Sequence, residues 1–185
     1  RDLHHQPAMN KTFASSMMAC LPALALVAAL GNSSALAGTR LDDSASPRAL
    51  VQAPNMVSEY GYPVNQYVPG APVAQRGIVD FGRIEYRLAT APYVGRHARI
   101  YFVIPPSVIG LRSPQGLQVS WRSEGNFASG SGRPGDKVQV WSGWVRDAFM
   151  SEAIALRMEF ALREMNVQAS KGISLECFFE IEVGP

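Results

Sequence analysis

Hydrophobic and polar residues alternate along the C-terminal part of the chain, which is the pattern of strands with one buried face. Apolar residues of 84–88 occupy every second position, whereas the preceding Val79 and Phe81 have the opposite parity. Gly82 lies at this change of parity, so we expect a β-bulge there. The segment 173–183 has an eleven-residue row of the same alternation and predicts a long strand with one buried face.

Other segments add strands to this pattern. The run 98–104 is continuously apolar and is ended by two prolines, which predicts a strand buried on both faces. The alternation in 117–121 places Trp121 in the core, and 137–145 resumes the strand pattern. The segment 124–136 between them is rich in glycine and serine and predicts a flexible hairpin loop.

The segment 152–165 gives two conflicting signals. Its residue types favour a helix, because Ala, Leu, Met, Glu and Arg dominate it. Its apolar residues, however, occupy every second position from Ile154 to Leu162 with charges between them. A helix with that spacing would spread its charges around more than one face. We therefore favour a strand, and a helix here would make the fold α+β.

These segments give about six strands within 77–185, separated by turn signals. Short turns between strands are typical of antiparallel sheets, because parallel strands need long crossover connections. The prediction is an all-β domain over 77–185, an antiparallel β-sandwich of immunoglobulin-like size. A small barrel is the second interpretation.

Composition changes the picture at the N-terminal side. Hydrophobic residues make up 47% and charged residues only 17% of the 185 residues, against about 25% charged in ordinary domains. Residues 9–37 explain this, because Lys11, the apolar run 17–30 and the small residues of 35–37 are typical of a signal peptide. The apolar run is too short to span a bilayer. We expect residues 1–8 to be an upstream extension.

Cleavage after residue 37 predicts a mature chain that begins near Gly38 and is exported to the periplasm, the cell surface or the medium, with no transmembrane segment. Residues 38–76 carry five prolines and no sustained periodicity, which indicates a proline-rich arm or linker. Three tyrosines interleave with these prolines, and they either dock on a partner, fold back on the chain's own domain or lie in a disordered leader. They are Tyr60, Tyr62 and Tyr67.

Residues that carry chemistry are scarce in the mature chain. Cys177 and His97 are its single cysteine and histidine, which is too few for a zinc site. The parity of Cys177 places it in the core row, so a Cys177–His97 nucleophile pair is disfavoured. Three glutamates share the other face of 173–183 and indicate a solvated strand face rather than a glycosidase pair or a calcium site: Glu176, Glu180 and Glu182.

Motifs of other function classes are missing. The sequence has no G-x-S-x-G elbow, and the glycine-rich 125–135 lacks the Lys-Ser/Thr ending of a phosphate loop. The mature chain carries 15 basic and 14 acidic residues, which argues against binding nucleic acid. We therefore predict no catalytic residues, no cofactor and no metal.

Two tryptophans are candidates for contact with a ligand or partner. Trp141 and Trp144 have opposite parity, so at least one faces outward unless Gly143 marks a bulge. Aromatic side chains on a sandwich either stack on sugar rings or fill the core.

The order of signal peptide, proline-rich arm and short β domain ending in the alternating row 173–183 resembles exported fimbrial or pilin-type subunits. The resemblance implies an immunoglobulin-like sandwich completed by an extended segment from a neighbouring subunit. The expected function is therefore a non-enzymatic protein that contacts a protein partner, or further copies of itself, by strand addition. Two alternatives remain open: a carbohydrate- or lipid-binding module using Trp141 or Trp144, and an exported hydrolase using Glu176 or Asp147.

Overall fold

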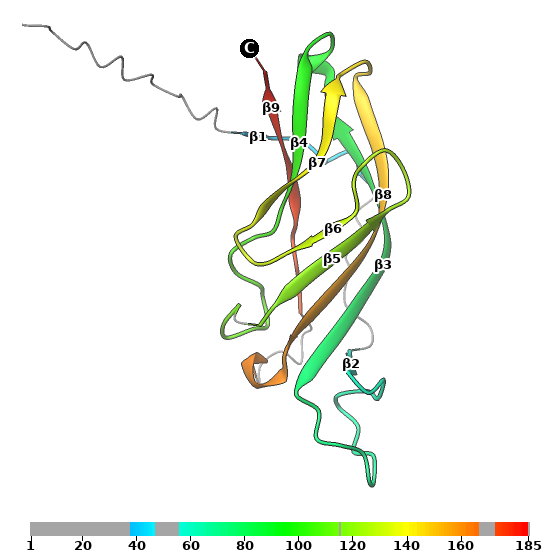
Figure 1. Ribbon diagram of the computed structural model, residues 1–185, viewed down its shortest axis with the longest axis vertical. Coiled ribbons are helices and arrows are strands. Elements are labelled where there is room, and N and C mark those ends of the chain that lie inside the picture. The colour runs from blue at the N-terminus through cyan, green and yellow to red at the C-terminus, as the bar shows by residue number, and fades with distance from the viewer. Residues whose placement is uncertain (1–37, 47–55, 115, 167–172, 185) are drawn as a thin grey trace, which may run out of the picture. The chain divides into compact units, whose positions relative to one another are not determined.

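The computed structural model describes residues 38–46, 56–114, 116–166 and 173–184. The expected upstream extension and signal peptide lie outside the described residues. The alternating segments of the described chain form strands, and these build two antiparallel sheets that pack on each other (Figure 1). The predicted all-β antiparallel sandwich is confirmed.

Three of the four edge strands of the two sheets are short, and β7 is the exception. The order of the four-stranded sheet is β1 (Thr39–Arg40), β9 (Phe178–Val183), β4 (His97–Val103) and β7 (Lys137–Trp144). The order of the five-stranded sheet is β2 (Val57–Ser58), β3 (Arg76–Ala89), β8 (Phe149–Ala161), β5 (Gln118–Ser123) and β6 (Gly130–Gly132). Two 3₁₀ turns complete the described elements, η1 (Ala91–Tyr93) and η2 (Leu162–Glu164). The six longer strands correspond to the six predicted segments.

The longest strands, β3 and β8, pair along their whole length, and the predicted bulge interrupts them. The register shifts between Asp80 and Gly82, and Gly82 has a φ of 70°. Its N–H donates to the Asp80 Oδ1 at 2.8 Å. A positive φ is costly for any residue with a Cβ, which explains why the parity changes at a glycine.

The ambiguous segment 152–165 is mostly strand, so the α+β alternative is wrong. Strand β8 lies between β3 and β5, and both neighbours bond to its backbone. Burial of its alternate residues from Glu152 to Phe160 outweighs their helix propensity. The strand ends at Ala161, and Leu162, which the alternating row includes, lies in η2.

The core between the sheets is centred on aromatic rings. Phe179 lies 5.0 Å from Tyr86, 5.1 Å from Phe102 and 5.6 Å from Phe127, measured between ring centroids. Trp121 is 4% exposed, which confirms its predicted place in the core. Full burial of such a side chain contributes about 1.5–3 kcal/mol. These contacts connect both sheets without any disulfide among the described residues.

Three details of the predicted strands are wrong. Strand β4 is buried on one face only, because Arg99 is exposed and Tyr101 is half-buried under the Lys137 ammonium at 4.6 Å. Strand β9 begins at Phe178, and of the predicted row before it only Ile173 and Cys177 are buried. The glycine-rich segment 124–136 contains the short strand β6, which pairs with β5.

Candidate functional site

Residues 38–46, which we call the N-terminal strap, close one side of the sandwich. Its strand β1 pairs with β9, with Thr39 opposite Ile181 and Arg40 opposite Glu180. The next residue, Leu41, donates its N–H to the Phe179 carbonyl at 2.8 Å and is 3% exposed. The strap therefore supplies one of the four strands of this sheet and one side chain of the core.

Beyond Leu41 the strap crosses to the five-stranded sheet. The Asp42 carbonyl accepts a hydrogen bond from the Ala89 N–H at 2.9 Å. The Ser46 Oγ accepts another from the Arg87 N–H, also at 2.9 Å. Both donors belong to the edge of β3 that faces away from β8. The nine-residue strap therefore bonds to both sheets. The range 38–76, expected to be an arm, thus contributes β1 and β2 to the sheets.

The strap covers only part of the β9 edge. Gly184 donates its N–H to His97 of the neighbouring β4 at 3.0 Å. Because backbone groups alternate in direction along a strand, the bonding groups of Phe179, Ile181 and Val183 point to the strap side. Within the described residues, the register of β1 ends at Ile181. Val183 lies two residues further along β9, beyond the described part of this register.

A charge cluster lies where the strap meets β9. The Lys137 Nζ is 2.8 Å from the Glu180 Oε2 and 2.7 Å from the Glu182 Oε1. The hydrogen bond from Lys137 holds the pKa of the Glu182 carboxyl below its usual value. Of the three glutamates predicted to form a solvated face, Glu176 is exposed, whereas these two are half-buried and paired.

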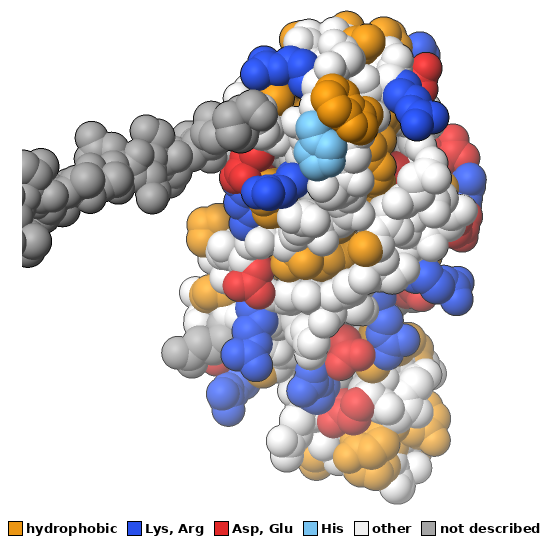
Figure 2. Space-filling model, turned by 45° about the horizontal axis from the view of Figure 1, so that its top comes forward, with side chains coloured by type: hydrophobic (Ala, Val, Ile, Leu, Met, Phe, Trp, Pro, Cys, Tyr) orange, Lys and Arg blue, Asp and Glu red, His pale blue; other side chains and the backbone are white. Residues whose placement is uncertain are grey.

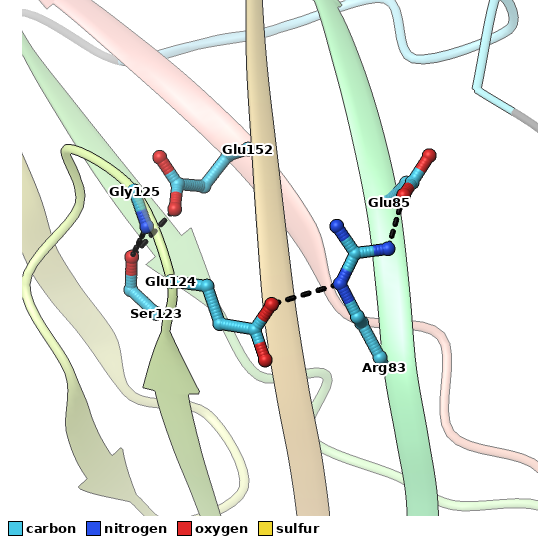
Figure 3. A network of polar contacts seen from close by, with 6 residues as sticks. All are labelled: Arg83, Glu85, Ser123, Glu124, Gly125 and Glu152. Carbon is cyan, nitrogen blue, oxygen red and sulfur yellow. Dashed lines mark hydrogen bonds and ion pairs between the residues drawn. The ribbon is translucent and has the colours of Figure 1, made fainter.

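A second polar network surrounds Glu152, which is 5% exposed (Figure 3). Its carboxylate accepts hydrogen bonds from the Ser123 Oγ at 2.5 Å, the Asn126 N–H at 2.8 Å and the Phe127 N–H at 3.3 Å. A Cβ on Gly125 would lie 2.6 Å from both carboxylate oxygens. The parity of Ile154 to Phe160 extends to Glu152, and this was the signal that could have identified a buried carboxylate.

An open cavity of about 440 Å³ lies beside this network. Arg83 lines it, and its guanidinium donates to the Glu124 Oε2 at 2.8 Å and also pairs with Glu85 (Figure 3). Each of the carboxylates drawn has a hydrogen-bond or ion-pair partner. The network fastens the 124–127 loop to β8 and β3.

Cys177 and His97 lie at opposite ends of the β4–β9 pair. Cys177 precedes Phe178, which pairs with Val103 at the end of β4, whereas His97 begins β4. Six strand residues separate them by roughly 20 Å. Cys177 is 8% exposed, and burial raises the pKa of its thiol to about 12. This geometry suits a core residue and not a nucleophile pair.

The predicted contact tryptophans lie near one end of the sandwich. Trp144 is 62% exposed and its ring meets His97 edge-on at 5.9 Å; hydrophobic side chains gather beside the histidine in Figure 2. Trp141 is half-buried against the core. The register shift of β7 falls at Val140, where Trp141 and Gln139 pair with successive residues of β4. The opposite parity therefore stands, with the bulge before Trp141 and not at Gly143.

The predicted contact tyrosines lie elsewhere. Tyr60, Tyr62 and Tyr67 follow β2 and are 49%, 44% and 87% exposed. Strand β2 pairs with the first residues of β3, whereas the tryptophans lie near the last residues of β3. The tyrosines and the tryptophans are therefore separated by roughly 35–40 Å along the strand. The five residues do not form one site.

Comparison of the chain with protein-family models, with curated proteins and with solved structures gave no match. Among the described residues, no helix has the length and apolar character needed to cross a membrane.

Proposed function

We propose that this protein is exported, has no enzymatic activity, and works through protein–protein contacts made by strand addition at the β9 edge. The observation that carries this proposal is the two-residue length of β1. An edge strand with unpaired backbone groups is a template for another chain. Main-chain hydrogen bonds supply the affinity in this mode of recognition, and pockets for alternate side chains supply the specificity.

The partner that fits best is the strap of a second copy. Its contacts are the β1 pairing, the buried Leu41 and the bonds of Asp42 and Ser46 to β3. Every one of these contacts is regained when the strap of a neighbouring copy takes the same place. Exchange of an identical element is a low-cost route to oligomers, and it agrees with the resemblance to pilin-type subunits.

A labelled peptide of residues 38–46 tests this proposal by competition. Mixed with the mature chain and followed by size-exclusion chromatography, it should co-elute with the protein and shift oligomers towards smaller species. The same peptide with Leu41→Asp is the control, because it keeps the backbone but cannot fill the core. A chain that stays monomeric at every concentration and binds neither peptide would overturn the proposal.

A second candidate function is binding of a carbohydrate or lipid at Trp144. The 62% exposure of its indole, next to His97, offers a flat apolar surface of the kind that stacks on sugar rings. Alanine at both Trp141 and Trp144 should abolish binding to a glycan array or to lipid vesicles while the strap exchange persists. Binding that is unchanged in this double variant rules the candidate out.

A further inference from the structure

The charge cluster at the strap lies directly against the residue that would begin the mature chain. A Cβ built on Gly38 would lie 2.6 Å from the Glu180 Oε2 and 2.6 Å from the Lys137 Nζ. The side-chain position of Gly38 is therefore directed at this ion pair, one residue before β1 begins. A larger residue at position 38 would displace the carboxylate or the ammonium.

The two carboxylates of this cluster differ in the cations that act on them. Glu180 and Glu182 share a single lysine through their ion pairs. The Arg99 guanidinium also acts on Glu182 through space, whereas Glu180 has Lys137 as its only ion-pair partner among the described residues. Both carboxylates are 22% exposed, so a further charge pair there is less screened than one on an open surface.

We infer that removal of the signal peptide at the Ala37–Gly38 bond creates an α-ammonium that binds the Glu180 carboxylate and fastens the strap to β9. This inference rests on the export proposed above. In the cleavage, a signal peptidase adds water across the peptide bond. The C–N bond breaks, Ala37 keeps the new carboxylate, and the Gly38 amine takes up a proton.

Two consequences follow from this contact, one for the residue at position 38 and one for the uncleaved precursor. Gly38 suits this position because it lacks the Cβ that would lie 2.6 Å from the Glu180 Oε2. The uncleaved precursor has a neutral amide at the same place, so its strap is held less firmly. Processing thus couples export to closure of the β9 edge, whichever copy supplies the strap.

Two mature chains of the same charge test the inference. One begins at Gly38, and the other begins at Ala35, which moves the ammonium about 10 Å along the chain. We expect the Gly38 chain to have a Tm about 2–4 °C higher and a Leu41 amide that exchanges about three-fold more slowly. Glu180→Gln should remove both differences, whereas Glu176→Gln in the same acidic row should keep them.

Equal stability of the two chains, or a difference that survives Glu180→Gln, would overturn the inference. N-terminal sequencing of the exported protein gives an independent check, because a first residue other than Gly38 also overturns it. These readouts use the monomer at low concentration, so they are separate from the strap exchange. A failed exchange experiment leaves the ammonium contact to be judged on these measurements alone.

Discussion

At the scale of single residues, the buried polar groups are those whose loss is most costly. Glu152 lies in the row of β8 that faces the core, and its carboxylate has three donors from the 123–127 loop. A buried acceptor with that many partners holds the loop in place, because its removal leaves N–H groups without a hydrogen-bond acceptor. Cys177, in contrast, is held as a neutral thiol among apolar neighbours.

Glu152→Ala should lower the free energy of unfolding by about 2–4 kcal/mol, since two backbone N–H groups lose their acceptor. Gly125→Ala should also destabilise the protein, because its Cβ meets the same carboxylate. Urea denaturation measures both. Glu124→Ala is the matched control, and loss of its exposed ion pair with Arg83 should cost less than about 1 kcal/mol. Equal effects of Glu152→Ala and Glu124→Ala would contradict the role given to Glu152.

Cys177 should make stability fall in alkaline solution. The unfolded thiol ionises near its ordinary pKa, about 8.5, whereas burial raises the folded pKa to about 12. Between these values the unfolded state has released a proton that the folded state keeps, so unfolding becomes easier as pH rises, by about 1.4 kcal/mol per pH unit. Denaturation of wild type and Cys177→Ala across this range should give diverging curves. Parallel curves would show that the thiol is not held neutral.

At the scale of elements, the strands that share one buried face were predictable, and the departures have physical causes. The parity change at Gly82 identified the bulge in β3, and alternation outweighed propensity in β8. Strand β4 is different, because an apolar sequence does not show whether a second layer covers it. Strands β1, β2 and β6 have two or three residues each, which is too short for any periodicity, so the strap could not be identified from sequence.

Substitution of Gly82, at the bulge of β3, tests the effect of backbone conformation on stability separately from packing. Gly82 has a positive φ, and no atom lies within 4 Å of a Cβ built on it. Gly82→Ala should therefore cost about 1–2 kcal/mol through backbone strain alone. Gly82→Asn should cost less, because asparagine tolerates the left-handed region. Thermal unfolding of the two variants checks this order, and a stabilised Gly82→Ala protein would exclude the strained bulge.

At the scale of the whole molecule, the strap joins the two sheets, because it bonds to β9 of one sheet and to β3 of the other. The tryptophans and tyrosines predicted as contact residues are divided between distant regions, and none of them belongs to the strap. Its role depends on contacts between residues more than a hundred positions apart, such as Leu41 and Phe179, and alternation along a chain carries no information about such pairs.

Leu41→Ala should destabilise the protein by about 2–5 kcal/mol, the usual range for a buried leucine. Hydrogen exchange should show faster exchange at Arg87 and Ala89, whose N–H groups bond to the strap. Arg40→Ala is the control, since Arg40 is exposed and leaves Leu41 in place. If both variants exchange alike, the strap is not held through Leu41.

Cross-linking of the strap to β9 tests the central claim most directly. Arg40 and Glu180 face each other as a pair without backbone hydrogen bonds between them, a geometry whose Cα separation of about 4.5 Å allows a disulfide. Arg40→Cys with Glu180→Cys, in a Cys177→Ala background, should give cross-linked monomers when dilute and covalent dimers and longer species when concentrated. A chain that forms only internal cross-links at every concentration would contradict strand addition between copies.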